Sequence, residues 1–119
     1  MKTFLITGSR SYTDKDIQMF KFAIAEHIGL TENALVVHGG APGADHIANE
    51  LCKYYSIPTK VIRPVNPKQK ISYLYRNAEM IGMADVVLVF WDGESRGTKF
   101  TSDYALARGK EVRFIDKGE

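Results

Sequence analysis

The sequence predicts an α/β domain in which a five-stranded parallel sheet of order 3-2-1-4-5 carries helices on both faces. Short apolar runs rich in β-branched residues alternate with helical patterns along all 119 residues. The run at 85–90 is almost continuously apolar, which is typical of the centre of a parallel sheet. The first two runs end in glycine turns that lead toward helices. We therefore expect a single domain over residues 1–119.

The strands come from short segments with a high content of Val, Ile, Phe and Thr. They are expected at 3–7, 34–37, 59–62, 85–90 and 111–115. Strands that alternate with helices in this way form parallel crossover units, and those crossovers are right-handed.

The helices are predicted from apolar spacing and from end signals. Thr13 with Asp16 forms a capping-box pattern before the first helix, and the second helix starts near Gly43. Asn66 is expected to cap the third helix with Pro67 at its first position. The residues of this helix expected to face inward are Ile71, Leu74, Tyr75, Ala78 and Ile81. The fourth helix is expected from about 97 to 108.

Composition excludes several classes of protein. Hydrophobic residues make up 45% of the chain and charged residues 25%, which is ordinary for a soluble globular protein. No apolar run approaches the roughly 20 residues of a membrane helix, and the N-terminal segment reads as a strand rather than a signal peptide. Cys52 is the single cysteine, so an intrachain disulfide and a cysteine metal cluster are excluded. We expect a cytoplasmic protein with no metal, no cofactor and no membrane partner.

Positive charge gathers in the middle of the chain, although the net charge of +2 does not by itself indicate nucleic-acid binding. Residues 51–78 contain no acid. Their basic residues are Lys53, Lys60, Arg63, Lys68, Lys70 and Arg76, and their tyrosines are Tyr54, Tyr55, Tyr73 and Tyr75. This segment is either a solvated basic face with half-buried tyrosines or a surface for a polyanion on which bases stack.

The expected strand order places a ligand site at the carboxyl ends of strands 1 and 4, where the chain reverses direction. In the first turn, Gly8 permits positive φ or a close backbone approach. Ser9 can donate to a phosphate oxygen, and Arg10 can clamp one. The turn matches neither the dinucleotide fingerprint nor a Walker loop, so a simple tight turn is the alternative.

The second turn holds Gly39, Gly40 and Gly43 between a strand and a helix. Backbone N–H groups in such a turn, together with the helix dipole, form a phosphate site. Asp45 falls in the first helical turn, where it either binds a ribose hydroxyl or stabilises the helix. His38 ends the preceding strand and is a candidate ligand contact.

Two further segments belong to the same edge. Arg76, followed by Asn77, either reaches a phosphate or forms a surface ion pair with Glu79 at i, i+3, and the sequence alone favours the ion pair. In the segment Ser95–Thr98, Gly97 offers a backbone N–H, and Thr98 offers a hydroxyl or serves as an N-cap.

Trp91 stands at the end of the fourth strand. Its ring either stacks on a base or plugs the edge of the sheet.

Four motifs, in order, carry a resemblance to a known family. They are Ile6-Thr7-Gly8-Ser9-Arg10, His38 to Asp45, Arg76-Asn77-Ala78-Glu79-Met80, and Ser95-Arg96-Gly97-Thr98. Together they resemble the SLOG superfamily, which joins the DNA-processing Smf proteins to the Lonely-guy cytokinin-activating enzymes. Within it the chain is similar to the small stand-alone branch of YspA/YpsA-type proteins. The resemblance implies a Rossmann-like domain that binds nucleotides or nucleotide derivatives, and a possible homodimer.

The Lonely-guy branch cleaves the bond between base and ribose with an arginine and a glutamate. Arg76 falls on the matching arginine, whereas Thr101 stands where the resemblance implies the glutamate. The other acids near this edge are Asp45, Asp92, Glu94 and Asp103, none of them in the family's position.

The sequence therefore supports three hypotheses. The first is binding of a nucleotide or nucleotide-derived small molecule, with phosphate on the Gly39–Gly43 turn and the Gly97–Thr98 helix end, and Arg10 and Arg76 as counter-charges. The second is an N-glycosidic, phosphoribohydrolase-like activity, with Arg76 and Asp45 as the catalytic candidates. The third, implied by the Smf branch, is binding of single-stranded DNA.

Overall fold

The structure is a computed structural model that describes residues 1–116. Its strands and helices, in chain order, are β1 (Lys2–Gly8), the short 3-10 helix η1 (Asp14–Asp16), α1 (Ile17–His27), β2 (Ala34–His38), α2 (Ala44–Tyr54), β3 (Thr59–Val61), α3 (Lys70–Met83), β4 (Val86–Phe90), α4 (Arg96–Ala107) and β5 (Glu111–Ile115). All strand pairs are parallel and their order is β3-β2-β1-β4-β5. The predicted fold class and strand order are confirmed.

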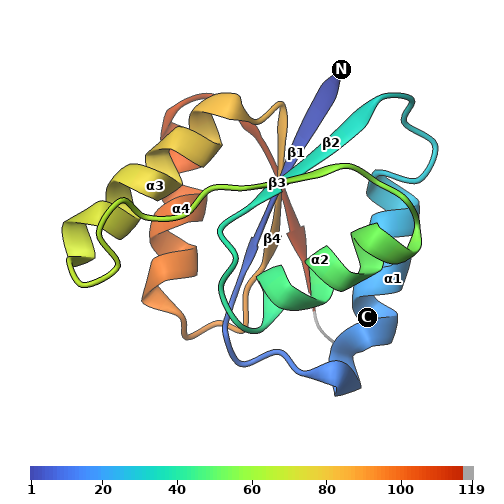
Figure 1. Cartoon of the computed structure of the whole chain (residues 1–119), viewed down its shortest axis with the longest axis horizontal. Helices are drawn as coiled ribbons and strands as arrows, with labels where there is room; N and C mark the ends of the chain where they lie inside the picture. The colour runs from blue at the N-terminus through green and yellow to red at the C-terminus, as the bar shows by residue number, and fades with distance from the viewer. Residues whose placement is uncertain (117–119) are drawn as a thin grey trace.

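The helices cover both faces of the sheet (Figure 1). Helices α1 and α2 lie on one face, and α3 and α4 lie on the other. Each face therefore has its own apolar core. On the α1–α2 face, the rings of Phe20 and Phe90 stack with centroids 4.1 Å apart. On the other face, Met80 and Ile81 of α3 pack toward Leu5 and Val87 of the two central strands. No helix within residues 1–116 combines the length and apolarity of a membrane span.

The start of the third helix differs from the prediction. Helix α3 begins at Lys70, not at Pro67. Asn66 does cap backbone, but in a turn: its Oδ1 accepts a hydrogen bond from the N–H of Lys68 at 3.0 Å. The N–H of Asn66 donates to Ser72 Oγ at 2.8 Å, which fastens this turn to the helix proper. The capping box of Thr13 and Asp16, by contrast, is confirmed.

The buried face of α3 is also rotated from the predicted one. Ile71, Leu74 and Tyr75 are 51%, 40% and 70% exposed, although apolar spacing predicted them to be inside. The buried residues of this helix are Ser72, Arg76, Met80 and Ile81. The reason is chemical: the guanidinium of Arg76 finds its hydrogen-bond acceptors at the edge of the sheet, and the helix turns toward them.

The basic middle segment is divided between two ends of the molecule. Tyr54 and Tyr55 close α2 at the end remote from the glycine turn, and both are exposed. Tyr73 lies at the other end, where α3 approaches the carboxyl edge of the strands. The tyrosines of the segment 51–78 therefore do not form one stacking surface.

Candidate functional site

The two glycine turns are in contact with each other. Gly43 has φ of +80°, and a Cβ at this position would lie 2.6 Å from Arg10 Cα. The N–H of Ala44 donates to the carbonyl of Ser9 at 3.2 Å. A Cβ at Gly8 would lie 2.5 Å from the Cβ of Ala44. These glycines therefore allow α2 to begin directly against the end of β1.

Three N–H donors of the second turn, those of Gly39, Gly40 and Ala41, are used inside the protein. Asp45 Oδ2 accepts from the N–H groups of Gly39 at 3.1 Å and Ala41 at 3.2 Å. His38 Nδ1 accepts from the N–H of Gly40 at 3.0 Å. The turn was expected to present these groups to a phosphate. Instead, the first turn of α2 brings a carboxylate to the position an anion would take.

His38 supports this turn from behind. Because Nδ1 accepts from Gly40, the ring proton lies on Nε2, which donates to Asn49 Oδ1 at 2.9 Å. The side chain is 2% exposed. It faces a separate hollow next to the helix start, with His46 and Arg63.

Arg76 is the central charged group of the site. Its side chain is 9% exposed. Nη1 donates to the carbonyls of Gly39 at 2.8 Å and Ile62 at 3.2 Å, and Nε donates to Asn77 Oδ1 at 2.8 Å. Its Cζ lies 5.3 Å from the ring centroid of Tyr73. The predicted surface ion pair with Glu79 does not form among the described residues.

Burial shifts the pKa of both charged groups beside the turn. Burial raises the pKa of Asp45 against the opposing effects of its two N–H donors, His38 and Arg76. Burial likewise lowers the pKa of Arg76, against the favourable charge of Asp45. The two groups therefore stabilise each other's charged form.

A third loop is tied to the first turn by Asp92. Its Oδ1 accepts from the N–H groups of Glu94 at 2.9 Å and Ser95 at 3.0 Å, and Oδ2 accepts from Ser11 Oγ at 2.7 Å. Its own N–H donates to Ser9 Oγ at 3.1 Å. These hydrogen bonds hold the pKa of Asp92 below its usual range.

The start of α4 is open to solvent. Ser95, not Thr98, is the N-cap: its Oγ accepts from the N–H of Thr98 at 3.3 Å and donates to Thr98 Oγ1 at 3.1 Å. A Cβ on Gly97 would meet no atom within 4 Å. The N–H groups of Arg96 and Gly97, in the first turn, have no acceptor among residues 1–116.

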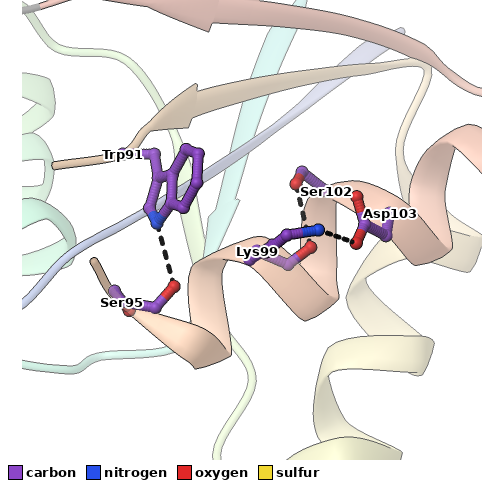
Figure 2. Close-up of polar contacts among 5 residues, drawn as sticks. All are labelled: Trp91, Ser95, Lys99, Ser102 and Asp103. Carbon is purple, nitrogen blue, oxygen red and sulfur yellow. Dashed lines mark hydrogen bonds and ion pairs between the residues drawn. The ribbon is translucent and has the colours of Figure 1, made fainter. Parts of the chain in front are cut away.

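Trp91 holds the same loop from its other side (Figure 2). Its Nε1 donates to the carbonyl of Ser95 at 2.9 Å, and its ring packs against the apolar core on the α3–α4 face. This corresponds to the alternative in which Trp91 plugs the edge of the sheet. Asp103 is engaged elsewhere, in an exposed ion pair with Lys99 at 2.7 Å.

These loops surround a cleft of about 500 Å³ at the carboxyl edge of the sheet. The predicted site residues that line it are Gly8, Ser9, Arg10, Asp45, Arg76, Asn77, Ser95, Gly97 and Thr98. Those outside its lining are His38, Gly39, Gly40, Gly43 and Trp91. These residues outside the lining shape the backbone of the glycine turns or support the loops that border the cleft.

The cleft also contains residues that were not predicted to bind. Tyr73, Leu74 and Met80 form an apolar wall along α3. Met80 ends the third motif and Tyr73 belongs to the basic middle segment, but none of the three was named as a site residue. Helical spacing could have indicated Tyr73, because it precedes Arg76 by about one turn and therefore lies on the same side of the helix.

Thr101 lines the cleft as well and is 1% exposed. Its Oγ1 donates to the carbonyl of Gly97 at 3.0 Å. This is the position where the family resemblance implies a glutamate. The described acids of the cleft are Asp45, Asp92 and Glu94.

No family model and no curated protein sequence matches the chain. Solved structures do share its fold. DNA processing protein A from Streptococcus pneumoniae superposes with a TM-score of 0.83 at 18% identity, over 99% of this chain and 51% of that one. DNA processing protein A from Helicobacter pylori, which binds single-stranded DNA, superposes with a TM-score of 0.74 at 23% identity, over 98% of this chain and 66% of that one.

The protein TM1055 superposes with a TM-score of 0.69 at 20% identity, over 94% of this chain and 72% of that one. The chain spans about half of the length of DNA processing protein A from Streptococcus pneumoniae. The motif resemblance and the shared fold point to the same group of structures, and the fold that the resemblance implied is confirmed.

Proposed function

We propose that the cleft binds a nucleotide or a nucleotide-derived small molecule, with a phosphate at the N-terminus of α4. This proposal rests on the burial and the hydrogen bonding of Arg76. Its buried guanidinium is fixed by three acceptors, which leaves Nη2 without a partner among residues 1–116. A buried cation held in one orientation at the wall of a polar cleft is arranged to meet an anion.

The start of α4 supplies the remaining donors. The N–H groups of Arg96 and Gly97 meet no acceptor in the described part of the chain, and the helix dipole favours a negative charge there. The hydroxyl of Thr98 lines the cleft and accepts a hydrogen bond from Ser95 Oγ, so its own proton is left to donate. This combination of backbone, hydroxyl and guanidinium donors suits a phosphate monoester.

The apolar part of a nucleotide has a complementary surface. Tyr73, Leu74 and Met80 line the α3 side of the cleft, opposite the polar loops. A cleft with an apolar wall and a few fixed polar groups is the usual form of a small-molecule site. The base would lie on this wall, with the phosphate at α4.

We also propose that the protein forms a homodimer, and that it acts in the cytoplasm. The exposed apolar residues of α3 outside the cleft, Ile71 and Tyr75, together with Phe100 of α4, support self-association. Sedimentation equilibrium of the wild type and Tyr75→Glu tests it. A dimer in the wild type and a monomer in the variant are expected, and a wild-type monomer at all concentrations contradicts it.

Cleavage of the ligand is a second candidate function because Asp45 lies in the cleft with a raised pKa. Such a carboxyl group suits general-acid chemistry. However, Asp45 Oδ2 is engaged with the turn, and Thr101 provides no carboxylate at the position of the family's glutamate. We therefore place binding without cleavage first.

Single-stranded DNA is the third candidate. It is favoured by the fold shared with the Helicobacter pylori protein and by Arg10 at the rim of the cleft. Binding of this kind weakens steeply as salt increases, because counterions are released from the strand. A DNA titration at two salt concentrations distinguishes it from nucleotide binding.

A thermal-shift screen of nucleotides, NAD derivatives and ADP-ribose tests the main proposal, with mass spectrometry of each hit after incubation. A ligand at about 100 times its Kd stabilises the fold by ~2.7 kcal/mol. Recovery of an intact ligand supports binding alone, and recovery of free base or ribose phosphate supports the hydrolase. The absence of any hit contradicts both.

A further inference from the structure

A second hollow of about 330 Å³ adjoins the cleft on the far side of Arg76. We call it the arginine recess. Three arginines line it, Arg10, Arg63 and Arg76, together with residues 39–42. Arg10 comes from the first turn, Arg63 from the segment after β3, and Arg76 from α3. Three separate segments of the chain therefore bring positive charge to one place.

These charges lack a sufficient counter-charge within the described chain. Neither Arg10 nor Arg63 makes an ion pair or side-chain hydrogen bond among residues 1–116. The neighbouring carboxylate is that of Asp45, whose Oδ2 already serves two N–H groups. The positive charges of Arg10 and Arg63 add to burial in lowering the pKa of Arg76. Arg10 and Arg63 are exposed to solvent, and an anion bound between them and the buried Arg76 would be attracted by all three charges.

Arg63 is an exposed residue whose guanidinium lies against the second glycine turn. A Cβ at Gly40 would lie 2.8 Å from Arg63 Nη1, and φ of Gly40 is +71°. The glycine thus leaves the space that the guanidinium occupies against the turn. Pro42, Pro64 and Pro67 stiffen the walls, which reduces the entropy lost when a ligand is bound.

The recess and the cleft are adjacent and share part of their lining. Arg10, Ala41, Tyr73 and Arg76 line both. A ligand whose first phosphate lies at α4 can therefore extend across Tyr73 and Arg76 into the recess.

We propose that the arginine recess binds a second phosphate of the same ligand, so that the ligand is a nucleoside unit with a phosphate on each side of its ribose. This rests on the proposed function for the first phosphate. The unit is either a free nucleoside bisphosphate or the phosphorylated end of a strand. Both carry two phosphate groups on one sugar, and the second of these phosphates is the group that the three arginines would bind.

Calorimetric titration tests this with adenosine 3′,5′-bisphosphate and adenosine 5′-monophosphate at one fixed ionic strength. A phosphate bound by charged donors gains roughly 2 kcal/mol, so we expect the bisphosphate to bind roughly 30-fold more tightly. Arg63→Gln is expected to remove this difference, and Arg63→Lys to keep part of it, because an ammonium retains the charge without the bidentate geometry. Lys60→Gln is the matched control, since Lys60 is an exposed cation on β3 outside both hollows.

The outcomes are separable. Equal binding of the two nucleotides, or an Arg63→Gln variant that keeps the preference, overturns the recess proposal and leaves the proposed function standing. Equal weakening by Lys60→Gln also overturns it, because the effect would then be general charge. If neither nucleotide binds and no other nucleotide binds, the proposed function fails as well.

A 5′-phosphorylated dinucleotide distinguishes the two sources. If the recess serves a strand end, the dinucleotide matches the bisphosphate, and Arg63→Gln weakens both. If it serves a free small molecule, the bisphosphate alone shows the Arg63-dependent gain. Either result supports a second phosphate site, and a lack of Arg63 dependence with both ligands overturns it.

Discussion

Arg76 Nη1 donates a hydrogen bond to the carbonyl of Gly39 at 2.8 Å and thereby joins α3 to the turn after β2. The residues are 37 positions apart in sequence. The same turn receives the carboxylate of Asp45 on its N–H groups. A buried cation and a buried anion thus bind opposite polar groups of one backbone segment, which fixes both the turn and the wall of the cleft.

Gly39→Ala is expected to destabilise the fold. A Cβ there would lie 2.7 Å from Arg76 Cζ, and the guanidinium cannot move without losing its carbonyl acceptors. Such overpacking costs about 1–3 kcal/mol in urea unfolding. Gly82→Ala is the control, because a Cβ there meets no atom within 4 Å and alanine favours the helix. Equal stability of the two variants would show that the contact has no consequence.

Arg76→Lys is expected to lower the free energy of unfolding by roughly 2 kcal/mol, since an ammonium cannot reproduce the planar set of bonds to Gly39, Ile62 and Asn77. Arg113→Lys serves as the comparison, because Arg113 contacts Glu111 and His27 at a partly exposed position, where such contacts contribute little. Chemical denaturation measures both. A loss no greater than that of Arg113→Lys would argue against the anchoring role of Arg76.

The raised pKa of Asp45 makes the free energy of unfolding fall as pH rises. Its pKa in the folded state is raised above the ordinary value of 3.8, so the folded protein binds more protons than the unfolded one between the two values. The contribution of Asp45 is full below pH 3.8 and is lost as pH rises through the folded pKa. The stability of wild type relative to Asp45→Asn should therefore fall as pH increases from about 4, measured by urea unfolding. A relative stability that rises over this range would show that the pKa is lowered.

Gly97→Leu is expected to fold normally. The position opens onto the cleft, and a side chain there meets no described atom within 4 Å of its Cβ. Leucine is also a better helix former than glycine, so the Tm should be unchanged or higher. Differential scanning calorimetry checks this, and a clear fall in Tm would mean that the start of α4 is not open as described.

Much of this architecture follows from the sequence, because strands and glycine turns are local signals. The apolar run before Asp92 and the Gly43 turn identify their elements without tertiary information. The face of α3 does not follow in this way. Apolar spacing favoured Leu74 and Tyr75, whereas burial of Arg76 depends on the carbonyls of Gly39 and Ile62, which directly follow β2 and β3 and are remote in sequence.

The role of the second turn was hidden for a similar reason. Its glycines indicate free N–H groups, and only the folded helix shows that Asp45 reaches back to them. The convergence of Arg10 and Arg63 likewise depends on the order of the strands and on the path of the segment after β3.

The most direct test of the account is a calorimetric titration of wild type and Gly97→Leu with adenosine 5′-monophosphate, or with whichever nucleotide the thermal-shift screen identifies. If the phosphate lies at the start of α4, the wild type binds and the variant binds at least roughly tenfold more weakly, since about 1.4 kcal/mol of contacts is lost from a folded protein. Equal affinity in the two proteins would contradict a phosphate site at α4.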